Sequence, residues 1–201
     1  LSKNHLPLIR LPAAAVVLTS SLRRRAQLLH HRPDLQVLDI RGNVTTRIRK
    51  WQEGPAHALV MAAAGLNRIQ MQNHITERLD PMQFLPACGQ GALALQIRQD
   101  DTDLAALLQK LDDPAARAAV TAERTLLAAL QGGCQIPIGA HARLENGKLS
   151  LKAMIADVCG VCYITAEDTG AIDQPEDLGK RLADQLIEQG AQKILDEIKN
   201  Q

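Results

Sequence analysis

The amino-acid sequence predicts an α/β protein with two domains, and two patterns carry this prediction. Over the first 85 residues, short apolar runs rich in β-branched residues alternate with segments of helical periodicity, which is typical of βαβ units in a mostly parallel sheet. After residue 130, strand-like segments come first and helical segments follow, which indicates a small α+β domain. Because 46% of the 201 residues are hydrophobic but only 1% are aromatic, we expect cores built from Leu, Ile, Val and Ala.

The first domain, residues 1–85, is expected to alternate strand and helix three times. Strands are predicted at residues 13–19, 35–40 and 57–62. Helices are predicted at residues 22–32, 44–52 and 63–71. The hydroxyl-rich cluster Thr19-Ser20-Ser21 supplies an N-cap for the first helix, Pro33-Asp34 ends it, and Arg41-Gly42-Asn43 makes the turn into the second.

Residues 86–113 are expected to connect the two domains. Their first six residues, Pro-Ala-Cys-Gly-Gln-Gly, are punctuated by glycine and proline as in a hinge. A short strand is predicted at residues 92–99, and the acidic residues that follow it open a helix.

The second domain, residues 114–201, is expected to begin with a helix at residues 114–130, which has proline in its first turn. Asn146-Gly147 is a strong hairpin signal between strands at residues 140–144 and 148–156. A third strand is predicted at residues 160–167. A helix over residues 175–200, with Gly190 as a break, ends the pattern.

The charge distribution points to an anionic ligand for the first domain. Residues 1–80 carry 12 Lys and Arg against 5 Asp and Glu, whereas residues 81–201 carry 11 against 17. A small polycarboxylate or phosphate would suit this basic half, and so would nucleic acid. Nucleic acid is disfavoured, because aromatic residues for base stacking are scarce and no nucleic-acid-binding motif is recognisable.

The sequence also favours the cytoplasm and no membrane contact. No apolar run approaches the ~18 residues of a membrane-spanning helix, and no secretory signal is visible. Four cysteines in a chain of this length do not resemble a disulfide framework. The first residue is Leu, which suggests a fragment or a processed piece.

Five arginines of the first domain have similar positions relative to its predicted strands. Each of them follows a predicted strand, and the carboxyl ends of parallel strands are where open α/β sheets bind ligands. They are Arg23, Arg24, Arg41, Arg47 and Arg68. Arginine pairs bidentately with carboxylate or phosphate, so a ligand with many carboxylates would fit. The alternative is a solvated basic helix face, which suits Arg25, Arg49 and Lys50 well.

Cys134 lies in the loop Gly132-Gly133-Cys134-Gln135-Ile136-Pro137, where two glycines leave room beside the sulfur and a proline restricts the backbone. A thiol held in such a loop could anchor a covalent group. Taken alone, the loop also fits the commoner case of a buried cysteine that acts as a small apolar residue.

Five motifs, in this order, closely resemble the porphobilinogen deaminase (hydroxymethylbilane synthase) family. They are residues 19–24 (TSSLRR), 38–47 (LDIRGNVTTR), 64–68 (AGLNR), 86–92 (PACGQGA) and 132–139 (GGCQIPIG). The resemblance implies a periplasmic-binding-protein-like first domain and a transferase that condenses four porphobilinogen units head to tail with release of ammonia. It also implies that the complete protein is a monomer and that it acts in tetrapyrrole and heme biosynthesis.

The resemblance also assigns roles to residues. Cys134 would carry a dipyrromethane cofactor through a thioether, and the five arginines would hold the acetate and propionate groups of the growing chain. Thr19, Ser20 and Ser21 match hydroxyl and amide contacts beside them, and Gln90 matches a residue between the domains. No metal is expected, and Cys159-Gly160-Val161-Cys162, outside the family pattern, is interpreted as incidental rather than as a metal or redox site.

One further domain of the family has no counterpart in these residues. That domain supplies the catalytic aspartate, so the resemblance implies no catalytic residue among residues 1–201 and no activity of this polypeptide alone. The predicted strand at residues 92–99 would then lack its sheet and form an exposed, aggregation-prone edge. The alternative is a non-catalytic paralogue that binds polycarboxylates or pyrroles.

Overall fold

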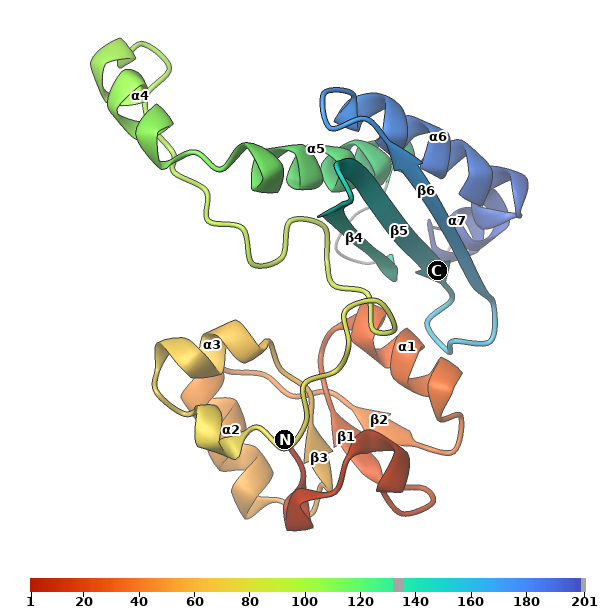
Figure 1. The fold of residues 1–201 in the computed structure, drawn as a ribbon. Helices are drawn as coiled ribbons and strands as arrows, with labels where there is room; N and C mark the ends of the chain where they lie inside the picture. The colour runs from red at the N-terminus through yellow and green to blue at the C-terminus, as the bar shows by residue number, and fades with distance from the viewer. Residues whose placement is uncertain (132–135, 200–201) are drawn as a thin grey trace.

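The structure is a computed structural model that describes residues 1–131 and 136–199. It contains two separate three-stranded sheets, one parallel and one antiparallel, each with its own helices (Figure 1). The expected fold class, α/β with a small α+β part, is confirmed. Within the described residues, no helix is long and apolar enough to cross a membrane.

The parallel sheet has the strand order β2-β1-β3. Its strands are β1 (Val16–Leu18), β2 (Gln36–Leu38) and β3 (Ala58–Leu59). The helices of this unit are α1 (Leu22–His31), α2 (Val44–Glu53) and α3 (Ala63–Arg68), and short 3-10 turns lie at Lys3–His5, Leu8–Arg10 and Gln72–His74. The expected alternation of strand and helix is confirmed.

Helices cover both faces of this sheet, because successive residues of a strand point to opposite sides. Val17 of β1 packs with Leu28 of α1 on one face. On the other face, Ile48 and Trp51 of α2 pack with Leu66 of α3. The strands are therefore held between two apolar layers built mostly from aliphatic side chains, with Phe84 against the first layer and Trp51 in the second.

The helix starts follow the capping residues that the sequence offers. The Ser21 hydroxyl accepts a hydrogen bond from the Arg24 N–H, and the Asn43 side chain accepts one from the Thr46 N–H. These bonds satisfy N–H groups that have no partner inside the helix. They also fix where the first turn of each helix lies relative to the end of the preceding strand.

The predicted strand at residues 92–99 is wrong. The chain there forms no strand, and Leu93 and Leu95 are 92% and 60% exposed. A strand needs a neighbour for its backbone hydrogen bonds, and no described segment pairs with this one. The expected helix after it is present as α4 (Thr102–Leu108), capped by Asp101 and followed by a 3-10 turn at Gln109–Leu111. Figure 1 shows α4 projecting away from both sheets.

The antiparallel unit begins with α5 (Pro114–Ala129) and has the strand order β4-β5-β6. Its strands are β4 (Ile138–Glu145), β5 (Lys148–Ala156) and β6 (Tyr163–Gly170), and α6 (Pro175–Glu188) and α7 (Ala191–Lys199) follow. The expected hairpin at Asn146-Gly147 is confirmed: both residues have positive φ, 50° and 76°, as a type I′ turn requires.

The two faces of β5 have different partners. Leu149, Leu151, Ala153 and Ile155 pack in the core that α5, α6 and α7 cover. The alternate residues Met154 and Ala156 instead pack against Ala26 of α1 and against Leu85. The antiparallel sheet thus lies between its own helices and the arginine-bearing helix of the parallel unit.

Candidate functional site

The site is built around the carboxyl ends of the parallel strands. Residues 19–21 follow β1, Arg41 follows β2, and residues 60–62 follow β3. Because β1 lies between β2 and β3, the chain runs from the central strand to one edge of the sheet and then crosses to the other edge. A crevice at such a point is the usual ligand site of open α/β sheets.

The hydroxyls of Thr19, Ser20 and Ser21 build this turn. Ser20 Oγ donates to the Ile40 carbonyl and accepts from the Ile40 N–H at 3.1 Å, which ties the end of β1 to the end of β2. Thr19 Oγ1 accepts from the Ser21 N–H at 3.3 Å, and Ser21 caps α1. All three side chains therefore hold the backbone on which the arginines stand.

Arg23 and Arg24 are two partly buried cations on the first turn of α1. Nη1 of Arg23 donates to the Leu85 carbonyl, and Nη2 donates to Gln90 Oε1 at 3.3 Å. Nη1 of Arg24 donates to the Val60 carbonyl at 3.5 Å. Burial, reinforced by the charge of Arg24, lowers the pKa of Arg23 to about 10. Burial, reinforced by the charge of Arg47, lowers the pKa of Arg24.

The other three arginines are less enclosed. Arg47 lies in α2, half-buried, and its Nε donates to the Gly42 carbonyl at 2.6 Å. Its charge is close enough to disfavour that of Arg24. Arg41 and Arg68 are exposed, in the turn after β2 and at the end of α3. The fold thus brings Arg23, Arg24 and Arg47 together and places the remaining pair at the periphery.

None of these five arginines is paired with an acidic side chain among the described residues. Six other arginines are paired in this way, for example Arg32 with Asp34 and Arg181 with Asp168. Partly buried like charges without counterions are unfavourable in the free protein, since burial and mutual repulsion both penalise the charged forms. A bound anion would offset both effects.

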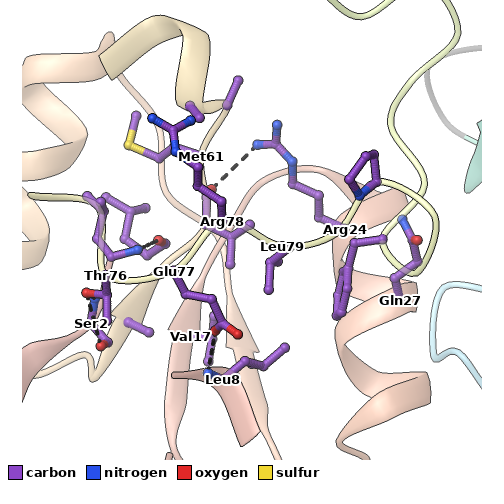
Figure 2. A pocket seen from close by; sticks show the side chains of 18 of the residues that line it. Ser2, Leu8, Val17, Arg24, Gln27, Met61, Thr76, Glu77, Arg78 and Leu79 are labelled. Carbon is purple, nitrogen blue, oxygen red and sulfur yellow. Dashed lines mark hydrogen bonds between the residues drawn. The ribbon is translucent and has the colours of Figure 1, made fainter. Parts of the chain in front are cut away.

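A cavity of about 420 Å³ adjoins these cations. Arg23, Arg24 and Gln90 line it, whereas Thr19, Ser20, Ser21, Arg41, Arg47 and Arg68 do not. Its wall is otherwise largely apolar, with Leu8, Val17 and Phe84 among the lining side chains. Figure 2 shows Arg24 extending from α1 into this space. Such a volume is in the usual range for a small-molecule pocket.

The sequence patterns did not indicate five polar residues that line the cavity: Ser2, Gln27, Thr76, Glu77 and Arg78. Gln27 is fully buried, and its Nε2 donates to the Leu85 carbonyl at 3.0 Å. Glu77 accepts from the Leu8 N–H at 2.7 Å (Figure 2). Arg78 donates to Asn67 Oδ1 at 3.3 Å. Of these residues, only Gln27 could have been suspected from the sequence, because it is a polar residue on the apolar face of α1.

Of the four cysteines, three belong to the described residues. Burial raises the pKa of the Cys88 thiol to about 12, with a smaller effect of the Glu123 charge. Cys159 and Cys162 are exposed and free, and their N–H groups donate to the Asp157 carboxylate. Residues 1–131 and 136–199 contain no cluster of three or more His, Cys, Asp and Glu that could hold a metal. Cys134 lies outside the described residues.

Comparisons with known proteins agree with these features. A family model described as "Porphobilinogen deaminase, dipyromethane cofactor binding domain" matches residues 1–106, which contain the whole arginine set. A second, described as "Porphobilinogen deaminase, C-terminal domain", matches residues 117–188, which contain Cys134.

Curated proteins named porphobilinogen deaminase are similar over nearly all of this chain. The one from Desulforudis audaxviator is 49% identical over 195 residues, which are 97% of this chain and 63% of the relative. That from Syntrophobacter fumaroxidans is 46% identical over 94% of this chain and 61% of the relative. That from Carboxydothermus hydrogenoformans is 44% identical over 99% of this chain and 64% of the relative. The chain therefore spans a little less than two thirds of the length of these relatives.

Proposed function

Because the chain belongs to the porphobilinogen deaminase family, we propose that its arginine-lined crevice binds the acetate and propionate groups of a linear pyrrole chain. The resemblance carried by the five motifs is confirmed by the two family models and by the relatives. The observation that supports the proposal best is the set of five arginines without acidic partners among the described residues, two of them beside the cavity.

The residues fit a dipyrromethane cofactor. Each of its two pyrrole rings carries an acetate and a propionate, so the group needs several cations and an apolar surface. Arg23 and Arg24 supply partly buried cations, Arg47 adds a third close by, and the cavity wall is largely apolar. We propose that these residues and the more peripheral Arg41 and Arg68 hold the carboxylates, with Gln90 fixing Arg23.

Cys134 is proposed as the point of covalent attachment. A thiolate is a good nucleophile for an electrophilic methylene carbon, and the resulting thioether is stable. When bound, the cofactor supplies the pyrrole end that each new porphobilinogen extends. In the chain, Cys134 stands between α5 and β4, whose described residues lie in the antiparallel unit.

For the complete protein we propose the hydroxymethylbilane synthase reaction, in which four porphobilinogen units condense head to tail and ammonia leaves at each step. The proposed division is a carboxylate-binding domain at residues 1–85, a connecting segment at 86–113 and a cofactor-attachment domain at 114–201. We also propose a cytoplasmic, monomeric protein. Size-exclusion chromatography with light scattering tests the last point.

A binding experiment tests the role of the arginines. Isothermal titration calorimetry of residues 1–201 carrying Cys134→Ser, which leaves the site without an attached cofactor, with a free dipyrromethane bearing two acetates and two propionates measures affinity without requiring turnover. Arg24→Ala should weaken binding by about tenfold to a hundredfold, because hydrogen bonds to charged groups contribute about 1.5–3 kcal/mol. Arg49→Ala is the matched control, since Arg49 is exposed and paired with Glu53. Equal losses in both variants would refute the proposed site.

A mass measurement tests the attachment. Intact protein from cells that make porphobilinogen should be heavier by one dipyrromethane, and Cys134→Ser should lose this increment. Purified residues 1–201 alone should not convert porphobilinogen to hydroxymethylbilane, since the resemblance assigns the catalytic aspartate to a domain outside them. Turnover by this polypeptide would contradict that expectation. Binding without any covalent adduct would favour the non-catalytic paralogue.

A further inference from the structure

Glu123 is the only acidic side chain among the described residues that is buried, with 5% of its surface exposed. It lies on the apolar face of α5, beside Ala122 and one turn before Leu126, both of which belong to the core. A carboxylate in an apolar stripe is costly unless it is fully hydrogen-bonded. Its bonding partners therefore indicate why it is there.

Each carboxylate oxygen of Glu123 accepts from a different segment of the chain. Oε2 accepts from the Gly89 N–H at 2.6 Å, and Oε1 accepts from the Ala142 N–H at 2.7 Å. Nδ1 of His141 lies 3.9 Å from Oε1. Burial raises the pKa of this carboxyl despite these donors. Glu123 thus joins the turn at residues 86–91 to β4 of the antiparallel sheet.

The turn that Glu123 holds carries the contacts of Arg23. Leu85, just before it, accepts from Arg23 Nη1, and Gln90, directly after Gly89, accepts from Arg23 Nη2. On its other side, the Pro86 carbonyl accepts from the Ala140 N–H at 3.0 Å. Two hydrogen bonds, joined by the Gly89–Gln90 backbone, therefore connect Glu123 of α5 with the guanidinium of Arg23.

We propose that Glu123 is a positioning residue for the carboxylate site: it fixes the Gly89–Gln90 backbone, and through Gln90 it sets the orientation of the Arg23 guanidinium. The proposal rests on the proposed function for its effect on ligand binding. The orientation of Arg23 can be measured without any ligand.

The contact between the two sheets does not depend on this carboxylate. The His30 and Tyr163 rings stack with centroids 3.9 Å apart, and His30 Nδ1 lies 3.2 Å from the Gly160 carbonyl. Met154 and Ala156 also pack on α1 and Leu85. We therefore expect a variant of Glu123 to keep the two units docked and to disturb only the turn.

Glu123→Gln tests the proposal, because a glutamine has the same shape but only one oxygen, so it can accept from only one of the two N–H groups. Glu197→Gln, an identical change at an exposed position, is the control. In nitrogen–proton NMR spectra of the free protein, Glu123→Gln should shift the Arg23 Nε–H and Gln90 side-chain signals, and Glu197→Gln should not. Unshifted Arg23 and Gln90 signals in Glu123→Gln would overturn the proposal.

Titration with the dipyrromethane tetracarboxylate gives the second readout. Glu123→Gln should bind about threefold to tenfold more weakly, the equivalent of one hydrogen bond. Combined with Gln90→Ala it should cause no further loss, since both changes act on the same contact to Arg23. Additive losses would mean that Glu123 has only a structural role.

The two proposals fail in different ways. If the wild-type protein binds no tetracarboxylate, the proposed function falls, while the Arg23 and Gln90 signals still decide the role of Glu123. If Glu123→Gln does not fold, Glu123→Asp keeps the charge but shortens the reach, and the same signals should shift.

Discussion

Gly160 gives the sharpest test of how the two units are docked. It lies in the turn between β5 and β6 with φ +71°, and a Cβ at this position would lie 2.2 Å from the Ala26 carbonyl oxygen and 2.7 Å from the His30 nitrogen. Both atoms belong to the backbone of α1, which cannot move aside as a flexible side chain would. Gly160→Ala should therefore push the antiparallel unit away from the arginine-bearing helix.

The size of the effect follows from two contributions. An alanine in the left-handed region costs about 1 kcal/mol, and crowding of a packed contact costs about 1–3 kcal/mol more. Gly147→Ala isolates the first contribution, because Gly147 has φ +76° and no heavy atom within 4 Å of its Cβ position. The free energy of unfolding should thus fall about 1–3 kcal/mol further in Gly160→Ala than in Gly147→Ala.

Urea unfolding followed by circular dichroism measures this difference. Because Tyr163 is the only tyrosine of the chain, its ring signals in NMR report the stack on His30 without overlap. Gly160→Ala should shift them, and Gly147→Ala should not. Equal losses of stability in the two variants, or unchanged Tyr163 signals in Gly160→Ala, would refute the reasoning.

Three other predictions concern exposed and buried side chains. Replacing the four most exposed leucines of the connecting segment, Leu93, Leu95, Leu107 and Leu111, by serine should reduce aggregation, measured by light scattering, without lowering the free energy of unfolding. At pH 8 a chromogenic disulfide should react quickly with the exposed Cys159 and Cys162 but slowly with Cys88. The Cys88 thiol has a pKa of about 12, so only about 10⁻⁴ of it is present as thiolate at this pH. Fast reaction of Cys88 in the folded protein would contradict its burial. Burial also raises the pKa of Tyr163 to about 12. Because the folded state then keeps protons that the unfolded state releases, stability should fall as the pH rises from about 9 towards 12, and less steeply in Tyr163→Phe.

Local features could be predicted because neighbouring residues decide them. The cap at Ser21, the turn at Asn43 before α2 and the turn at Asn146-Gly147 depend on side chains a few positions away, and each lies where the sequence indicates. Residues 92–99 have the apolar content of a strand but form none, since a strand also needs a partner. Local pattern contains no information about that partner.

The sequence by itself determined the family, the alternation of strand and helix, and the placing of five arginines after three parallel strands. These follow from residue order, since a parallel sheet gathers the ends of its strands at one edge whatever the details of packing. Only the tertiary structure decided that Arg23 and Arg24 are partly buried beside a cavity while Arg41 and Arg68 are exposed. It alone showed that Glu123 joins the turn before Gln90 to β4, and that Gly160 packs against α1. These contacts join residues tens of positions apart, and burial and hydrogen bonding at such distances depend on how the two sheets dock.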